Sequence, residues 1–262
     1  MTGRVAEVFA NAARDGRAVL VGYLPAGFPA VDTAVAAMRA MVEGGVDVVE
    51  VGLPYSDPLI DGPVIQAAVD RALAGGTRVS DVLATVEAVA SAGAPVLVMT
   101  YWNPIERYGV ERFAAALAAA GGSGMITPDL TPEEAGPWLA AAEKHGLDPV
   151  FLVAPSSSDD RIRRVGATGR GFIYAASTMG VTGARERVSA RAPELVARAK
   201  ALVSLPVAVG LGVSNAEQAA EVAGYADGVI VGSAFVRCLD EAGVDGVHGL
   251  AEALASGVRR RV

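Results

Sequence analysis

A carboxylate, Glu50, stands inside a mostly apolar segment, residues 45–52, in which Asp47 is the only other charged residue. Side chains alternate between the two faces of a β-strand, so Glu50 would share a face with Val46 and Val48 and point into a core. A buried charge is costly unless it is paired or used. A second carboxylate, Asp61, follows on the segment after this predicted strand. The two groups are suited to acid–base catalysis, although a paired structural carboxylate would explain Glu50 equally well.

Other catalytic groups are scarce in this chain. The only histidines are His145 and His248, and neither follows a predicted strand. A histidine-based metal site and a Ser–His–Asp triad are therefore not expected. The only lysines, Lys144 and Lys200, fall on predicted helices, which argues against a Schiff-base mechanism. Proton transfer is left mainly to carboxylates and tyrosines.

Composition limits the partners that the chain can have. It has 262 residues, is 52% hydrophobic and carries a net charge of -7, with a pI of about 5.0. This acidic balance does not favour binding to nucleic acid or to an anionic membrane. The single cysteine, Cys238, excludes an intramolecular disulfide and is typical of a reducing compartment. With no apolar signal or membrane-spanning run, we expect a cytoplasmic protein.

Short β-branched runs alternate with alanine-rich helical stretches along the whole chain. Eight such runs are predicted to be strands: Val19–Tyr23, Val46–Val51, Pro95–Tyr101, Gly124–Thr127, Pro149–Val153, Gly171–Tyr174, Pro206–Val209 and Gly228–Val231. Each is followed by a helical pattern, and no linker interrupts the chain. We predict that residues 1–262 form one α/β domain, a (β/α)8 TIM barrel with an extra N-terminal helix. The alternative is an open doubly wound sheet, which eight strands and the lack of a glycine-rich first turn disfavour.

Some helix boundaries are marked by local signals. Thr131–Glu134 and Ser214–Glu217 each have the pattern of a capping box at a helix start. Gly146, directly after Lys144 and His145, is typical of a helix end.

Glycine-rich segments follow the last two predicted strands. The segments are Gly210–Ser214 and Gly232–Ala234, and each opens a helix. Glycine lets backbone N–H groups approach a ligand, and a helix N-terminus favours an anion. Barrels often bind phosphate at these two loops, so we predict a phosphate site there. The loop after the sixth strand, Met179–Glu186, is polar and rich in glycine, as in a lid or an ordinary surface loop.

Six motifs are distributed along nearly the whole chain: Glu50–Gln66, Met99–Pro104, Pro128–Leu130, Gly180–Gly183, Gly210–Ser214 and Gly232-Ser233. In sequence and order they resemble the motifs of tryptophan synthase alpha subunits. The first of them is highly specific to this family. The resemblance implies a barrel lyase that splits indole-3-glycerol phosphate into indole and glyceraldehyde 3-phosphate, without a metal or cofactor of its own.

The resemblance also implies roles for particular residues. Glu50 would shuttle protons between indole C3 and the glycerol hydroxyl, and Asp61 would accept the indole N–H and stabilise positive charge on the ring. Thr182, in the loop after the sixth strand, matches a position that contacts the loop carrying Asp61. The remaining matched positions bind substrate. Tyr23, Tyr101, Ile126 and Tyr174 would form the indole wall, Gly183, Gly212, Gly232 and Ser233 would bind the phosphate, and Leu211 would also contact substrate.

A partner is implied as well. Family members bind a beta subunit, which uses pyridoxal phosphate to join indole with serine, and an alpha2beta2 heterotetramer is expected. The matched contact positions are Pro54, Asp57 and Pro58, together with Asn103. Two other functions stay open at this point. One is a stand-alone lyase that releases free indole, and the other is a catalytically silent subunit that only regulates a partner.

Three places depart from the family pattern. Phe28 stands where many members have Asp, Gly122-Ser123 where many have Val-Asp, and Leu211 where Phe is common. None of these changes removes an acid, a base or a phosphate donor.

Overall fold

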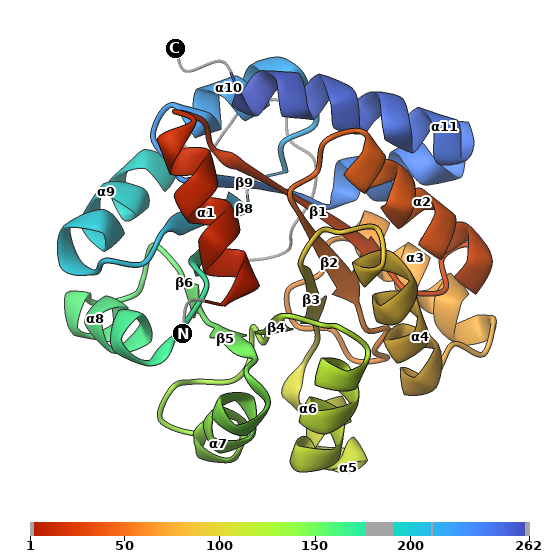
Figure 1. Ribbon diagram of the computed structural model, residues 1–262, viewed down its shortest axis with the longest axis horizontal. Helices are drawn as coiled ribbons and strands as arrows, with labels where there is room; N and C mark the ends of the chain where they lie inside the picture. Colours follow the sequence, from red (N-terminus) through yellow and green to blue (C-terminus); the bar gives the residue numbers. More distant parts are fainter. Residues whose placement is uncertain (1–2, 177–190, 211, 260–262) are drawn as a thin grey trace.

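Parallel strands close into a ring that helices surround on the outside (Figure 1). The computed structural model describes residues 3–176, 191–210 and 212–259. The strands of this part of the chain are β1 Val19–Pro25, β2 Val48–Gly52, β3 Val96–Met99, β4 Gly124–Ile126, β5 Asp148–Val150, β6 Leu152–Val153, β7 Ile173–Ala176, β8 Val207–Gly210 and β9 Gly228–Val231. Every pairing between them is parallel.

The nine strand labels correspond to eight barrel positions. Neighbours follow the order β5-β4-β3-β2-β1-β9-β8-β7-β6, so β5 and β6 stand at the two ends of the ladder. Only Phe151 separates them in sequence, and the backbone itself closes the ring there. The prediction of a (β/α)8 barrel is confirmed, and the open doubly wound sheet is wrong. The predicted strand Pro149–Val153 is one barrel position split by a break in pairing.

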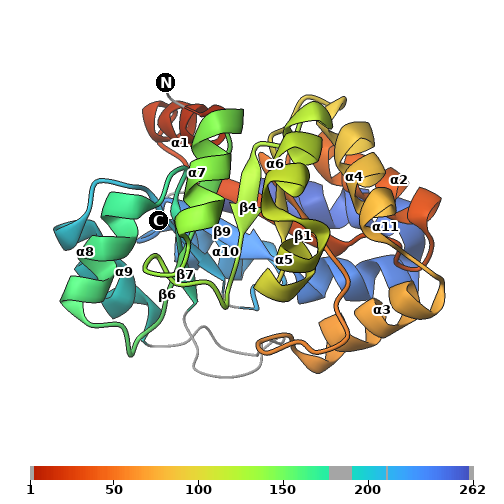
Figure 2. The ribbon, with the colours of Figure 1, turned by 90° about the horizontal axis from the view of Figure 1, so that it is seen from below.

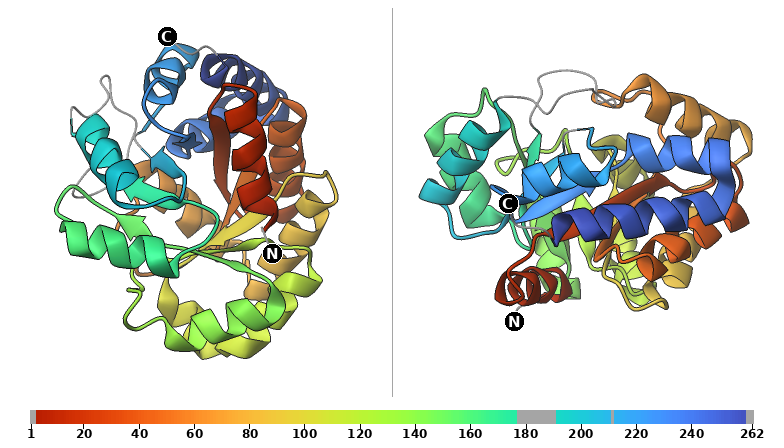
Figure 3. Two further views of the ribbon diagram at one scale, coloured as in Figure 1. Left: turned by 60° about the vertical axis from the view of Figure 1, so that its left-hand side comes forward. Right: turned by 90° about the horizontal axis from the view of Figure 1, so that it is seen from above.

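The helices fill the connections between strands. Those in the described ranges are α1 Arg4–Arg14, α2 Val31–Glu43, α3 Pro63–Ala74, α4 Val79–Ala90, α5 Trp102–Tyr108, α6 Val110–Ala119, α7 Gly136–His145, α8 Asp159–Thr168, α9 Ala192–Leu202, α10 Ala216–Ala223 and α11 Ser233–Val258. Helix α11 consists of two helices joined at Gly243, whose φ of 66° is costly for any other residue. It runs alongside α2 and α10 (Figure 3). None of the helices in these ranges is both long and apolar enough to span a membrane.

The helix ends predicted from local signals agree with the structure only in part. Gly146 does terminate α7, in the left-handed conformation with φ of 69°. The predicted start at Thr131 is wrong: α7 begins at Gly136, and the Thr131 hydroxyl instead hydrogen-bonds the Glu134 carboxylate at 3.0 Å within a turn. The second predicted box is displaced by one residue. Asn215 is the N-cap of α10, and its side chain accepts a hydrogen bond from the Gln218 backbone N–H.

Two separate apolar cores follow from the alternation along the strands. The larger core lies between the strands and the outer helices, and includes Val49 and Val51. The smaller one fills the barrel interior and includes Val48 and Leu97. Val46 belongs to the outer core, because β2 begins only at Val48. The expectation that Val46 shares a face with Glu50 is therefore wrong, whereas Val48 does lie on the interior side.

Helix α1 closes one end of the barrel and confirms the expected extra helix. Val5, Phe9 and Ala12 recur on one face and pack into the interior core. The ring centroids of Phe9 and Phe172 are 5.3 Å apart. Figure 2 shows α1 at one end of the barrel and the loop that leads into α3 at the other. The ends of the strands that carry Glu50 and the loop after it are thus left open by α1.

Candidate active site

Glu50 lies in the interior of the barrel, on the third residue of β2. Its side chain is completely buried, and within the described residues neither carboxyl oxygen has a hydrogen-bond partner. Burial raises the pKa of Glu50 to about 8, since nothing nearby stabilises the ionised form. The structural alternative of a buried ion pair finds no partner among these residues. Glu50 is therefore protonated at neutral pH and able to donate a proton.

Asp61 approaches the same end of the barrel from the loop between β2 and α3. The Tyr101 hydroxyl donates a hydrogen bond to Asp61 Oδ1 at 3.1 Å. Gln66 donates to the Asp61 backbone carbonyl at 2.9 Å. Burial raises the pKa of Asp61 above its usual value, and the hydrogen bond from Tyr101 opposes part of that rise. Among the described residues, the two carboxyl groups differ in that Asp61 has a hydrogen-bond donor and Glu50 has none.

Tyrosines from three strand ends surround these carboxyl groups. Tyr23 pairs in register with Glu50 on the neighbouring strand. Burial and the charges of Asp61 and Glu50 raise the pKa values of Tyr23 and Tyr174 well above the usual range. Burial raises the pKa of Tyr101 to about 12. The three phenols therefore stay protonated, and they can pack against a flat ligand without adding charge.

Glycines give two of these tyrosine rings their space. A Cβ at Gly52 would clash with the Tyr23 hydroxyl, and one at Gly210 would clash with the Tyr174 hydroxyl. Gly232 lies against the Tyr23 ring, where a Cβ would be 3.2 Å from Cδ1. The glycines at strand ends thus serve aromatic packing as well as turns.

The predicted phosphate residues lie at the ends of β8 and β9. Gly212 adopts a φ of 71°, and Gly232 precedes the first turn of α11. Ser233 is buried at the start of that helix, where backbone N–H groups are free for an anion. Ile126 lies in the interior core at the end of β4. The site residues predicted at Thr182, Gly183 and Leu211 lie outside the described residues.

The predicted partner-facing positions vary in exposure. Asp57 and Asn103 are exposed, Pro58 is half-buried and Pro54 is buried. The segment also carries Leu59, which is 71% exposed and is the only exposed large hydrophobic residue in the described ranges. An exposed apolar side chain beside exposed polar ones is typical of a contact surface.

Tyr55 is a residue of this region that sequence reasoning did not single out. Its hydroxyl accepts a hydrogen bond from Asn103 Nδ2 at 2.9 Å, and its ring packs on Tyr101 with centroids 5.5 Å apart. The only signal for it was an aromatic residue within a proline-rich polar loop.

Two of the departures from the family pattern have a structural account. Phe28 is buried, and the Arg71 guanidinium lies 4.8 Å from its ring centroid. The residue is thus a packing element of the loop after β1. Gly122 and Ser123 precede β4, at the opposite end of that strand from the candidate site. Leu211 is outside the described residues.

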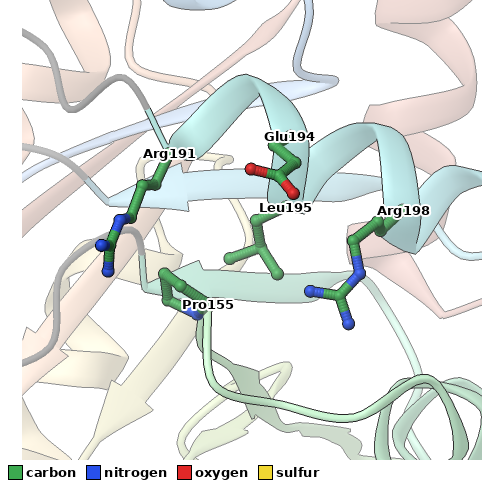
Figure 4. A pocket seen from close by; sticks show the side chains of 5 residues that line it. All are labelled: Pro155, Arg191, Glu194, Leu195 and Arg198. Carbon is green, nitrogen blue, oxygen red and sulfur yellow. The ribbon is translucent and has the colours of Figure 1, made fainter.

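A separate hollow of about 310 Å³ lies between α9 and the loop after β6. Figure 4 shows its lining, with Pro155 facing Arg191, Glu194, Leu195 and Arg198. The Arg198 guanidinium donates to the Ser157 carbonyl at 2.7 Å and pairs with Asp159 at 3.0 Å. This arginine is therefore already engaged in holding the loop. No predicted site residue lines the hollow, and across the described ranges no cluster of three or more His, Cys, Asp or Glu side chains could hold a metal.

Comparison with known proteins adds an independent observation. The family described as tryptophan synthase alpha chain matches residues 9–259. The tryptophan synthase alpha chain of Acidothermus cellulolyticus is 61% identical over 98% of this chain and 97% of its own length. That of Thermobifida fusca is also 61% identical, over 95% of this chain and 96% of its own.

Solved structures agree with these sequence relatives. A structure of Mycobacterium tuberculosis tryptophan synthase is 57% identical, covers 99% of this chain and 100% of the matched chain, and has a TM-score of 0.95. Tryptophan synthase subunit alpha from Legionella pneumophila is 34% identical, covers 98% of this chain and 99% of its own, and has a TM-score of 0.88. The likeness extends over the whole barrel, including the ends of the strands that carry the candidate site.

Proposed function

The chain belongs to the tryptophan synthase alpha chain family, and we propose on that premise that it cleaves indole-3-glycerol phosphate to indole and glyceraldehyde 3-phosphate. One observation carries the assignment of the chemistry. A fully buried Glu50, with no hydrogen-bond partner among the described residues, and a tyrosine-held Asp61 lie at the same end of the barrel in different environments. Two carboxyl groups in different environments can act as an acid and as an anion in one reaction.

The first step is protonation of the indole ring. Glu50 donates its proton to C3, and the ring becomes a C3-protonated iminium with positive charge on nitrogen. Asp61 accepts a hydrogen bond from the N–H and stabilises that charge. The ring then serves as the electron sink for the cleavage, so the chain needs neither a lysine nor a metal. We propose that no cofactor acts in this chain.

The second step is cleavage of the carbon–carbon bond. Glu50, now a carboxylate, removes the proton from the glycerol hydroxyl next to the ring. The carbonyl of glyceraldehyde 3-phosphate forms, the bond to C3 breaks, and its electron pair restores the aromatic indole. Glu50 ends the cycle protonated as it began. Because the site is buried, the raised pKa keeps the proton on Glu50 between turnovers.

The remaining residues would bind and orient the substrate. Tyr23, Tyr101 and Tyr174 would pack on the indole with Ile126 beneath them. Backbone N–H groups near Gly212, Gly232 and Ser233 would hold the phosphate at the start of α11. For Thr182, Gly183 and Leu211 we propose the same roles that the sequence resemblance implies. We also propose that residues 1–262 fold as one domain and act in the cytoplasm.

We further propose a beta subunit as partner, in an alpha2beta2 assembly, because the exposed residues of the 53–61 loop and Asn103 form a mixed apolar and polar surface. Pyridoxal phosphate would belong to that partner. The similar Mycobacterium tuberculosis structure is one of tryptophan synthase, which agrees with such an assembly.

Indole release from indole-3-glycerol phosphate, by the purified chain with and without a beta subunit, tests the function. We expect weak release alone and a large rise with the partner. Full activity that the partner does not change would favour a stand-alone lyase. Ligand binding with no indole from either sample would favour a regulatory subunit.

The pH profile of the same assay tests the roles of the two carboxyl groups. kcat/KM should fall above about pH 8 as Glu50 loses its proton, by about tenfold per pH unit. It should also fall on the acid side as Asp61 takes up a proton, at a pH above the usual pKa of an aspartate. A profile that is flat from pH 7 to 10 would contradict the role of Glu50.

A further inference from the structure

A series of side-chain contacts connects the surface of the barrel with Asp61. Asn103 lies exposed in the first turn of α5, and its Nδ2 donates to the Tyr55 hydroxyl at 2.9 Å. The Tyr55 ring packs on the Tyr101 ring, with centroids 5.5 Å apart and an angle of 38° between planes. The Tyr101 hydroxyl in turn donates to Asp61. Tyr55 is therefore in contact with the tyrosine that holds the carboxylate, without contacting the carboxylate itself.

The Tyr101 hydroxyl holds more than the carboxylate. It also accepts a hydrogen bond from the Ile60 backbone N–H at 3.1 Å. One phenol thus fixes both the side chain of Asp61 and the backbone just before it. Any tilt of the Tyr101 ring changes both hydrogen bonds together, because hydrogen bonds weaken steeply with distance and angle.

The two sides of this arrangement differ in the contacts that hold them. The start of α5 is anchored, since the Trp102 backbone N–H is 3.0 Å and 3.1 Å from the two carboxyl oxygens of Asp129. Asn103 and Tyr101 sit on that anchored start. Tyr55 and Asp61 sit on the loop after β2, which is partly exposed and carries the exposed Leu59. The hydrogen bond from Asn103 to Tyr55 therefore holds this loop against the start of α5.

We propose that Tyr55 is a positioning residue for the cleavage reaction, whose hydroxyl on Asn103 and ring on Tyr101 hold Asp61 in the orientation that accepts the indole N–H. The inference rests on the proposed function, since it gives Asp61 its role. Positioning matters here because a small misplacement of a catalytic group lowers the rate of reaction even when substrate affinity is unchanged.

The test compares Tyr55→Phe, Asn103→Ala and the double variant in the isolated chain. Each single change removes the same hydrogen bond and leaves the Tyr55–Tyr101 ring contact in place. We expect each to lower kcat about fivefold while KM changes less than about twofold, with the double variant no lower than either single one. Tyr108→Phe is the matched control. Tyr108 ends the same helix and packs on Phe113, so its loss of a hydroxyl should leave kcat unchanged.

The pH profile separates positioning from a general loss of stability. The Tyr101 hydrogen bond opposes the rise in the Asp61 pKa, so a loosened bond raises that pKa and moves the acid limb of kcat/KM to higher pH. Among the described residues, the titratable groups that interact with Asp61 are Tyr101, Tyr23 and Tyr174. The three tyrosines stay protonated, and Glu50 titrates on the alkaline limb. None of these groups therefore obscures a shift of the acid limb of kcat/KM.

Two results would overturn the inference. One is a Tyr55→Phe chain with the kcat and acid limb of the parent. The other is strict additivity of Tyr55→Phe and Asn103→Ala. If the parent chain and Tyr108→Phe release no indole, the proposed function fails instead. Amide hydrogen exchange then tests the positioning separately: the Ile60 N–H should exchange about fivefold faster in Tyr55→Phe, and unchanged exchange would refute it.

Discussion

The two ends of the barrel each bury a carboxyl group with a raised pKa, yet only one of them has the features of a site. At the end closed by α1, Asp148 begins β5 and lies against Gly3, the N-cap of α1. Burial raises its pKa to about 6, and the charge of Arg170 opposes the rise. At the open end, burial raises the pKa of Glu50 to about 8. A shifted pKa by itself therefore does not distinguish the two ends.

The neighbours make the difference. Asp148 lies beside an apolar plug, in which Phe9 packs on Phe172, and a helix N-terminus next to it favours its negative charge. Glu50 instead lies near Tyr23 and Tyr174, and the charge of Asp61 acts on the same two tyrosines. One end is packed shut by side chains, and the other presents polar groups at strand ends, where barrels place their active sites. We infer that Asp148 holds the plug and that Glu50 carries the chemistry.

Replacing one carboxyl group at each end by an amide is the most direct test of whether only the Glu50 end carries the chemistry. Glu50→Gln should lower kcat/KM about a thousandfold, because the amide cannot donate a proton to C3. Asp148→Asn, the same carboxyl-to-amide change at the other end, should alter kcat/KM by less than about twofold. Indole release and circular dichroism on both variants provide the measurement. An active Glu50→Gln chain, or an equally inactive Asp148→Asn chain, would remove the distinction.

A change in the plug should have the opposite signature. Phe9→Ala leaves a cavity between α1 and Phe172, and we expect the free energy of unfolding to fall by about 3 kcal/mol. kcat at 20 °C should stay close to that of the parent, because the open end is unaltered. Urea unfolding monitored by fluorescence tests this, with Phe9→Leu as a milder control. A loss of kcat that matches the loss of stability would mean that the ends are coupled.

The smallest expected effect is a difference in pH window between the two carboxyl groups. Each has a folded-state pKa above its unfolded value, so burial destabilises the fold increasingly as pH rises through that interval. For Glu50 the interval extends from about 4.5 to about 8, and for Asp148 from about 3.8 to about 6. Glu50→Gln should therefore gain stability relative to the parent mainly between pH 5 and 8.

Thermal unfolding from pH 4 to pH 9 measures both intervals. The gain of Asp148→Asn should be complete by about pH 7, whereas that of Glu50→Gln should still be growing there. Gains that develop over the same pH interval in both variants would show that the two environments are equivalent.

Local pattern in the sequence determined the elements and the chemistry that they could carry. Alternating β-branched runs located all eight barrel positions, because burial on both faces leaves a continuous apolar signal that does not depend on partners. Glu50 was found because a carboxylate is out of place in such a run, and Asp61 because it follows on the loop after that run. The scarcity of histidine and lysine limited the chemistry in the same way, since composition does not depend on folding.

Tertiary structure decided which residues lie in each core and which side chains contact one another. Val46 lies in the outer core and Val48 in the interior because β2 begins at Val48, and sequence periodicity cannot set where pairing begins. The bond from Tyr101 to Asp61 joins residues 40 apart, and the one from Asn103 to Tyr55 joins residues 48 apart. Such contacts depend on strand register and on how loops pack at the barrel end. No short-range pattern encodes either, so the groups that orient Asp61 became visible only in the folded chain.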